Sequence, residues 1–315
     1  MKLKRRDFLK GLAGSAVVAA AMPGTVLGRE VAPQEAMGIL YDATLCVGCQ
    51  ACMPACKEAN LMPQEHTGRK KIWDNPVDLS SKTLNIIKKY EHGTGKNKDK
   101  EENGYSFIKR QCMHCLKPAC TSACPASALK KDPLSGIVTY NSDACIGCRY
   151  CQVACPFNVP KFEWDNPFPK IVKCQLCRHL LDKGEISACC SACPTGASLF
   201  GRVDGLINEA KKRLTMIPGK YYEFPTMHLN SGNKQVHMSK TYINNIFGET
   251  EIGGTQVMLL SGVSFGKLGF PDLPDESYAI LSEGIQHSLY NKMILPAAAL
   301  GALSLLIAGR KKQDK

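Results

Sequence analysis

The sequence of 315 residues lacks the motifs that identify most enzymes and nucleotide-binding proteins. It contains no C-x-x-C-H segment, which argues against c-type haem, and no recognisable catalytic dyad, flavin motif or molybdenum motif. Its GTGK stretch is followed by Asn97 and is preceded by Tyr90 where a phosphate-binding loop requires glycine, which excludes that loop. No basic stripe interleaved with aromatic residues is present, so we expect no nucleic-acid partner.

Cysteine, by contrast, is abundant, with 17 residues. Small secreted domains use such a density of cysteines for disulfides, which replace a hydrophobic core. A chain of this length can bury an ordinary core, so the number of its cysteines must have another chemical cause. They fall into four runs: CVGCQACMPAC from Cys46, CMHCLKPACTSAC from Cys112, CIGCRYCQVAC from Cys145, and CQLC from Cys174 with CCSAC from Cys189.

The spacing of these runs favours iron–sulfur clusters. The first and third follow C-x2-C-x2-C-x3-C, the bacterial ferredoxin pattern, in which the fourth cysteine ligates the other cluster of a pair. The second and fourth widen one gap but keep a final C-x3-C-P. Zinc sites use C-x2-C pairs but do not require a third cysteine three residues after the pair, and disulfides do not require this repeated spacing. A zinc- or disulfide-stabilised envelope scaffold is therefore the weaker alternative.

The adjacent pair in the fourth run contains one cysteine too many. Counting back from Cys193 with the x3 spacing selects Cys189 as the ligand. We therefore predict that Cys190, the seventeenth cysteine, is a small buried apolar residue and dispensable for cluster binding.

The positive charge of the chain fits four clusters. The formal net charge is +12, and the first 28 residues contribute about +4 of it, which leaves about +8. An oxidised 4Fe–4S cluster with four thiolates carries about −2, so four would nearly cancel that excess. We interpret the basic residues near the cysteines as compensation for cluster charge: Lys57, Lys117, Lys130, Lys131, Arg149, Lys161, Lys173 and Arg178.

The two ends of the chain predict export and membrane anchoring. Arg5 and Arg6, followed by a short apolar stretch, resemble a twin-arginine signal over 1–28, with an ordinary secretory signal or an amphipathic helix as the alternatives. Seventeen uncharged residues between Lys292 and Arg310 predict a single transmembrane helix at 291–309 and a cytoplasmic tail at 310–315, with a buried core helix as the alternative. Together they place a periplasmic body on the inner membrane.

Short strand signals flank the cysteine runs and indicate an α+β fold. GILYD, YSFIK and KIVK precede runs, ASLFG follows the last, and 127–140 reads as a hairpin. Strand, cysteine loop, short helix and strand form the unit of a bacterial ferredoxin, so we expect two nested ferredoxin-like domains, each with two 4Fe–4S clusters. The outer domain is 37–56 with 170–201, and the inner domain is 112–169. A charged insertion fills 57–111, a surface helix is expected near 202–214, and a docking region with a linker fills 202–290.

Histidine offers one further candidate. His114 lies inside the second run and could donate a hydrogen bond toward cluster sulfur, which would adjust the reduction potential. An ordinary polar loop residue is an equally good interpretation.

Sixteen of the cysteines, in this order, resemble those of the four-cluster ferredoxin subunits in the dimethyl sulfoxide reductase iron–sulfur subunit family. The resemblance covers about 37–201. It implies the following ligands: the first cluster takes Cys46, Cys49, Cys52 and Cys193; the second takes Cys56, Cys174, Cys177 and Cys189; the third takes Cys112, Cys115, Cys120 and Cys155; the fourth takes Cys124, Cys145, Cys148 and Cys151. No tryptophan replaces a cysteine of the third run, so four 4Fe–4S clusters are implied.

A nearer resemblance is to the membrane-anchored subunit of this type in uptake nickel–iron hydrogenases. It is carried by GILYDATLCVGCQAC, GTGKNKDKEENGYSFIKRQCMHC, GGTQVMLLSGV and IQHSLY, and it runs nearly end to end. The fourth run departs from it, with a shorter gap and the extra Cys190.

This resemblance implies a non-catalytic electron-transfer subunit on the periplasmic side. It would take electrons from the small subunit of a hydrogenase, in complex with its large subunit, and pass them to an integral-membrane quinone-reactive subunit. A subunit serving nitrite, polysulfide or dimethyl sulfoxide reductase, or formate dehydrogenase, is the alternative, and the C-terminal anchor and the EENGY segment favour hydrogenase.

Overall fold

The computed structural model describes residues 29–65, 68, 72–280 and 283. The predicted signal at 1–28, the membrane helix at 291–309 and the tail at 310–315 lie outside these residues. Among the residues that are described, no helix is long and apolar enough to cross a membrane.

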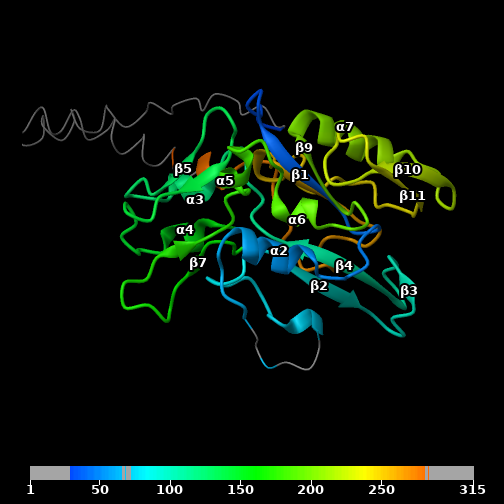
Figure 1. Cartoon of the computed structure of the whole chain (residues 1–315), viewed down its shortest axis with the longest axis horizontal. Helices are drawn as coiled ribbons and strands as arrows, with labels where there is room; N and C mark the ends of the chain where they lie inside the picture. Colours follow the sequence, from blue (N-terminus) through cyan, green and yellow to red (C-terminus); the bar gives the residue numbers. More distant parts are fainter. Residues whose placement is uncertain (1–28, 66–67, 69–71, 281–282, 284–315) are drawn as a thin grey trace, which may run out of the picture.

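A three-stranded sheet forms the centre of the larger part of the molecule (Figure 1). Its middle strand β1 (Met37–Asp42) pairs antiparallel with β9 (Ser198–Arg202) and parallel with β12 (Val257–Leu260). These strands coincide with the predicted GILYD, ASLFG and GGTQVMLLSGV signals. All four residues of β12 are buried, as expected for a strand covered on both faces.

The helix α7 (Val203–Leu214) covers one face of this sheet. Its Val203, Leu206 and Ala210 pack with Leu40 of β1 and Met258 of β12. The sequence predicts a surface helix here, and the helix is present. Its buried face, however, also carries charged groups, because Glu209 and Arg213 point inward.

The segment 57–111, expected as a charged insertion, contributes to the core on the other face of the sheet. It forms the short helix η1 (Ile72–Asp74) and a sheet of β2 (Ile86–Glu91), β4 (Gly104–Arg110) and β3 (Asn97–Lys98), in the order β2-β4-β3. Ile86 and Phe107 of this sheet share one buried cluster with Ile39, Tyr41 and Phe200 of the central sheet. Burial of apolar area thus joins the insertion to the outer domain.

Short helices carry many of the cysteines. They are α2 (Cys52–Ala59), α3 (Ala119–Ser122), α4 (Tyr150–Ala154), α5 (Arg178–Leu181) and α6 (Ala188–Ser191). Helix α2 of the first run packs against α6 of the fourth, and α3 of the second packs against α4 of the third. Figure 1 shows the two pairs in different parts of the molecule, α2 and α6 beneath β1, and α3 and α4 toward the opposite end from β3.

The inner domain has a small core of its own. The predicted hairpin is confirmed as β5 (Leu129–Lys131) and β6 (Val138–Tyr140), and β7 (Lys161–Phe162) pairs with β8 (Ile171–Val172). Leu129 and Cys151 form a buried cluster with Ile171, a residue of the segment 170–201 that was expected in the outer domain.

The segment 202–290, expected as a docking region and linker, is built into the outer domain in its described part. Besides α7 and β12 it forms the hairpin of β10 (Tyr221–Pro225) and β11 (Lys234–Met238), and the short helix η2 (Glu251–Gly253). Because β12 pairs directly with β1, this segment completes the central sheet rather than extending from it.

Candidate metal centres

The four cysteine loops share one backbone feature. The residue two positions after the first cysteine of each run has a positive φ: Gly48 at 71°, His114 at 48°, Gly147 at 70° and Leu176 at 54°. Glycine adopts this left-handed conformation without steric cost, whereas His114 and Leu176 are strained in it. Such strain persists where the surrounding structure requires the turn, and it marks candidate functional sites.

This turn directs backbone N–H groups at sulfur. The N–H of Gly48 donates to Cys46 Sγ at 3.4 Å, and the N–H of Leu176 donates to Cys174 Sγ at 3.3 Å. In the third run, the N–H of Gly147 bonds to the thiol of Cys145. Donors of this kind favour a charged sulfur, the form that ligates metal.

The first predicted ligand group surrounds a cavity at the end of β1. Cys46, Cys49, Cys52 and Cys193 line an open volume of about 300 Å³. Burial raises the pKa of Cys52 to about 12, because no full countercharge replaces the lost hydration. The N–H of Ser198 donates to Cys193 Sγ at 3.3 Å, so the last cysteine of the chain is held beside the first run.

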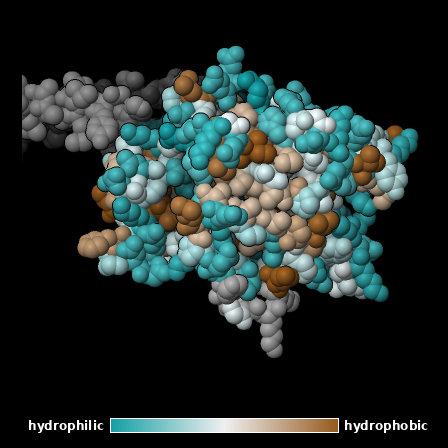
Figure 2. Space-filling view, viewed as in Figure 1, coloured by the Kyte–Doolittle hydropathy of each residue, from teal (hydrophilic) through white to brown (hydrophobic). Residues whose placement is uncertain are grey.

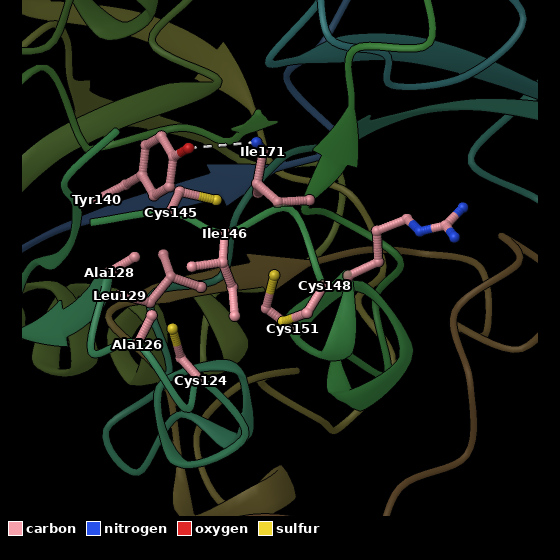
Figure 3. Close-up of a pocket in the computed structure, with 11 residues that line it drawn as sticks. Cys124, Ala126, Ala128, Leu129, Tyr140, Cys145, Ile146, Cys148, Cys151 and Ile171 are labelled. Atoms are coloured by element: carbon pink, nitrogen blue, oxygen red, sulfur yellow. Dashed lines mark hydrogen bonds between the residues drawn. The ribbon is translucent and has the colours of Figure 1, made fainter. Parts of the chain in front are cut away.

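The fourth predicted group surrounds a similar cavity in the inner domain (Figure 3). Cys124, Cys145, Cys148 and Cys151 line an open volume of about 320 Å³ together with Leu129, Tyr140, Ile171 and neighbouring residues. The Tyr140 hydroxyl accepts the N–H of Ile171 at 3.2 Å, shown as a dashed line. Burial opposes the thiolate of Cys145, but hydrogen bonds from Tyr140 and Gly147 outweigh it and lower the pKa of this thiol.

The third predicted group is also brought together. Cys115, Cys120 and Cys155 line an open volume of about 270 Å³, and Cys112 interacts electrostatically with both Cys115 and Cys120. Burial raises the pKa of Cys120 to about 12 and that of Cys155 to about 11.

The second predicted group is the most deeply enclosed. Cys56 interacts electrostatically with Cys189 and Cys177, and Cys174 interacts with Cys177 and Cys56. Burial raises the pKa of Cys56 to about 12. The structure therefore brings together the four thiols of each predicted group, from runs that lie far apart in the sequence.

The donor sets fit iron–sulfur clusters. All seventeen cysteines are free of disulfides. Within the described part of the chain, no three His, Cys, Asp or Glu side chains converge closely enough to hold a single metal ion. The thiols of the first and fourth groups each surround a cavity, and three thiols of the third group line another. Four soft thiolates around one space match the ligation of a 4Fe–4S cluster.

Cations that are buried (Lys57, Lys173) or half-buried (Lys131) accompany the thiols, as the sequence predicts. Lys131 Nζ donates to the carbonyl of Cys115 at 3.0 Å, and Lys173 Nζ donates to the carbonyl of Cys174 at 2.7 Å. Lys57 is likewise buried and donates to the carbonyl of Pro63 at 2.9 Å. Lys117 lines the cavity of the third group and forms an ion pair with Glu283, and Arg149 lines the cavity of the fourth group. Arg178 forms an ion pair with Asp182.

The cation most closely associated with sulfur is one that sequence reasoning missed. Lys109 of β4 is fully buried beside the thiols of Cys52 and Cys189. The available signal was a lysine inside the apolar strand segment YSFIK, three residues before Cys112.

His114 retains one unused hydrogen-bonding atom. Its Nδ1 accepts the N–H of Val138 at 3.2 Å, so Nε2 carries the proton of the neutral ring, and Nε2 is buried with no partner among the described atoms. Burial and the nearby Lys173 and Lys131 hold the pKa of His114 well below its usual value. The predicted donation toward cluster sulfur stays a prediction.

Comparison with known proteins now adds to this geometry. A family model described as a 4Fe–4S dicluster domain matches residues 104–203. The hydrogenase-2 operon protein HybA of Escherichia coli O157:H7 is 46% identical over 320 residues, which cover 99% of this chain and 97% of that protein. The chain belongs to the HybA family.

This chain, a member of the HybA family, is also similar in sequence to iron–sulfur subunits of other enzymes. The iron–sulfur subunit of the nitrate-inducible formate dehydrogenase of Escherichia coli K12 is 34% identical, over 63% of this chain and 65% of that one. The formate dehydrogenase iron–sulfur subunit of Haemophilus influenzae is 30% identical, over 85% of this chain and 77% of that one. The HybA match spans the whole chain, whereas these matches cover less of it.

Proposed function

We propose that this protein is a non-catalytic electron-transfer subunit that relays electrons from a nickel–iron hydrogenase to a quinone-reactive subunit in the membrane. When bound, the iron–sulfur clusters supply one-electron transfer. The chain holds their ligands at fixed positions, buries them from water and places charges around them.

The observation that carries this proposal is the order of the four thiol groups. Cys52 of the first group interacts electrostatically with Cys189 of the second, Cys174 of the second with Cys112 of the third, and Cys120 of the third with Cys151 of the fourth. Each group therefore adjoins the next. Such an arrangement supports a continuous relay across the molecule, and it does not require a substrate pocket.

We propose four 4Fe–4S clusters, ligated as the resemblance implies. The packing of α2 against α6 and of α3 against α4 supports two nested two-cluster domains, because each pair joins the runs that would share ligands. The first and second clusters would then belong to the outer domain, and the third and fourth to the inner domain.

The first and fourth thiol groups are the two ends of the proposed relay. Apolar side chains are exposed near each of them, which supports a partner contact at each end. Near the fourth group, exposed side chains include Ile146, Tyr150, Val153, Trp164 and Phe168. On the face shown in Figure 2, hydrophobic residues interrupt the hydrophilic surface at the end that carries α4 and β7.

The first group has a smaller exposed apolar set of its own. Cys49 is exposed, and Val47, Leu61 and Ile72 beside the first run are also exposed. Apolar surface at a relay terminus fits docking of another subunit, since close approach is what electron transfer requires. We propose that the hydrogenase contacts one terminus and the quinone-reactive subunit the other.

The proposed location is the periplasmic side of the inner membrane. It is supported by the twin-arginine stretch within 1–28 and by the apolar stretch at 291–309 with its basic tail. Formate dehydrogenase is the second candidate partner, because two of the relatives are subunits of that enzyme. The full-length HybA match favours hydrogenase.

Anaerobic purification in mild detergent, followed by identification of the co-purifying chains, tests this function. We expect a hydrogenase large and small subunit and hydrogen-dependent reduction of a quinone. Co-purification with a molybdenum enzyme and no hydrogen-dependent activity would instead assign the chain to a formate dehydrogenase or a related reductase.

A further inference from the structure

Lys109 occupies an unusual position for a lysine. It lies in β4, where it pairs with Ile87 of β2, and its side chain is 1% exposed. Its Nζ donates to Ser198 Oγ at 3.3 Å and lies beside the Cys189 thiol. Ser198 in turn bonds through its N–H to Cys193 of the first group.

The charge of Lys109 has sulfur as its counterpart. Among the described residues, no carboxylate forms an ion pair with it. The groups that interact with its charge are the thiols of Cys189, Cys52 and Cys190. A buried ammonium without a countercharge is strongly destabilising, so this position requires anionic sulfur nearby.

The ammonium adjoins two ligand groups at once. It acts on Cys52 of the first group and on Cys56, Cys177 and Cys189 of the second. A fixed positive charge stabilises the more negative, reduced state of a nearby cluster, and a hydrogen bond to ligand sulfur acts in the same direction. Both effects weaken with distance, so the third and fourth groups should be affected least.

We propose that Lys109 is a potential-setting residue shared by the first and second clusters, which its buried ammonium keeps easier to reduce than they would otherwise be. This inference rests on the proposed electron-transfer function and specifies how the outer domain tunes its half of the relay. Lys109 is a positioning residue, because it acts on the clusters through their ligands and through the electric field around them.

The test is a redox titration of the intact protein followed by electron paramagnetic resonance. Cys52→Ser and Cys56→Ser first identify the signals of the first and second clusters. Lys109→Met should then lower the midpoint potentials of those two clusters and leave the other two unchanged. Lys109→Arg, which keeps the charge, should restore both potentials in large part.

Lys89→Met is the matched control. Lys89 lies in the neighbouring strand β2, with Nζ 2.8 Å from Glu91 Oε2 and over the ring of Trp73, so its removal deletes the same charge from the same sheet without touching sulfur. All four potentials should stay unchanged in this variant. An equal shift in Lys89→Met would show that net charge alone is responsible and would overturn the proposal.

Two further outcomes would also overturn it. One is a Lys109→Met protein with full iron content and unchanged potentials. The other is loss of iron in both Lys109→Met and Lys109→Arg, which would make Lys109 a residue needed for folding. If Lys109→Met alone loses iron, unshifted potentials in Lys109→Arg support the role of the charge. Failure of the proposed function would be seen separately, because the unsubstituted protein would then lack these signals or its hydrogenase partner.

Discussion

The outer and inner domains use the same cysteine pattern in different surroundings. In the outer domain, the central sheet and the insertion sheet enclose the ligands, and Cys46, Cys52, Cys56, Cys177 and Cys189 are all buried. In the inner domain, the fully buried cluster is limited to three residues, and most cysteines are only partly buried. Apolar side chains such as Val153 and Phe168 are exposed around its fourth group.

This difference indicates a division of tasks. The outer domain surrounds its thiols with protein and supplies the buried charge of Lys109. On our proposal, the potentials of its clusters would therefore be set from within the chain. The inner domain leaves its last group close to an apolar surface, where a partner can complete the burial.

The adjacent cysteines of α6 give the sharpest test. Cys189→Ala should remove a ligand of the second cluster and lower the iron content by one cluster, with loss or alteration of one paramagnetic signal. Cys190→Ala should keep all four clusters, because the x3 spacing leaves Cys190 outside the predicted ligand set and its side chain is fully buried. Equal iron loss in the two variants would contradict the ligand assignment.

The buried charge network beneath α7 should dominate the stability of the outer domain. Arg213 is fully buried, donates to Asp42 Oδ2 at 3.0 Å and to Glu209 Oε1 at 2.9 Å, and lies over the ring of Phe224. Arg213→Met leaves Asp42 without its charged partner, so we expect a loss of about 3–5 kcal/mol in the free energy of unfolding.

The matched control is the exposed pair of Arg202 and Asp204. Arg202→Met should cost no more than about 1 kcal/mol, because solvent screens that pair. Denaturant unfolding of the purified chains measures both. Similar losses for the two variants would show that burial does not strengthen the network.

Alanine substitution at two equivalent loop glycines compares how tightly the two domains are packed. Gly48 and Gly147 have the same place in their runs and nearly the same φ, 71° and 70°. A Cβ at Gly48 would overlap the ring of Phe107, whereas at Gly147 it would lie 3.3 Å from the carbonyl oxygen of Pro169. Alanine should cost about 1 kcal/mol at either site for the positive φ, and about 1–3 kcal/mol more at Gly48 for the overlap. Equal losses in denaturant unfolding would contradict the tighter packing of the outer domain.

The smallest effect on stability is expected at the inner surface. Phe168 is 82% exposed, so Phe168→Ser should change the free energy of unfolding by less than about 0.5 kcal/mol. The same substitution should weaken association with the partner at this terminus, measured by co-purification yield. Unchanged association would exclude Phe168 from the docking surface.

The cysteine spacing made much of the candidate site predictable. A C-x2-C-x2-C-x3-C run specifies a local turn and a helix, so the loops, the 127–140 hairpin and the strands beside them follow from short stretches of sequence. The positive φ at Gly48 and Gly147 agrees with that local pattern.

Long-range packing was not predictable in the same way. The parallel pairing of β12 with β1 joins residues more than two hundred positions apart, and no local signal specifies it. Arg213 and Lys109 both look like surface residues in the sequence, since burial of a charge depends on partners such as Asp42 and Cys189 that only the fold brings near. The charged residues of 57–111 predict only a charged insertion. They do not predict strand β2, whose first two residues, Ile86 and Ile87, are buried.

The iron and acid-labile sulfide content of the anaerobically purified protein measures whether sixteen of its cysteines bind four 4Fe–4S clusters. We predict about sixteen iron atoms and about sixteen sulfides per chain, four of each for every cluster, with zinc absent. A chain with little iron, or with stoichiometric zinc in its place, would contradict the assignment of sixteen cysteines to four clusters.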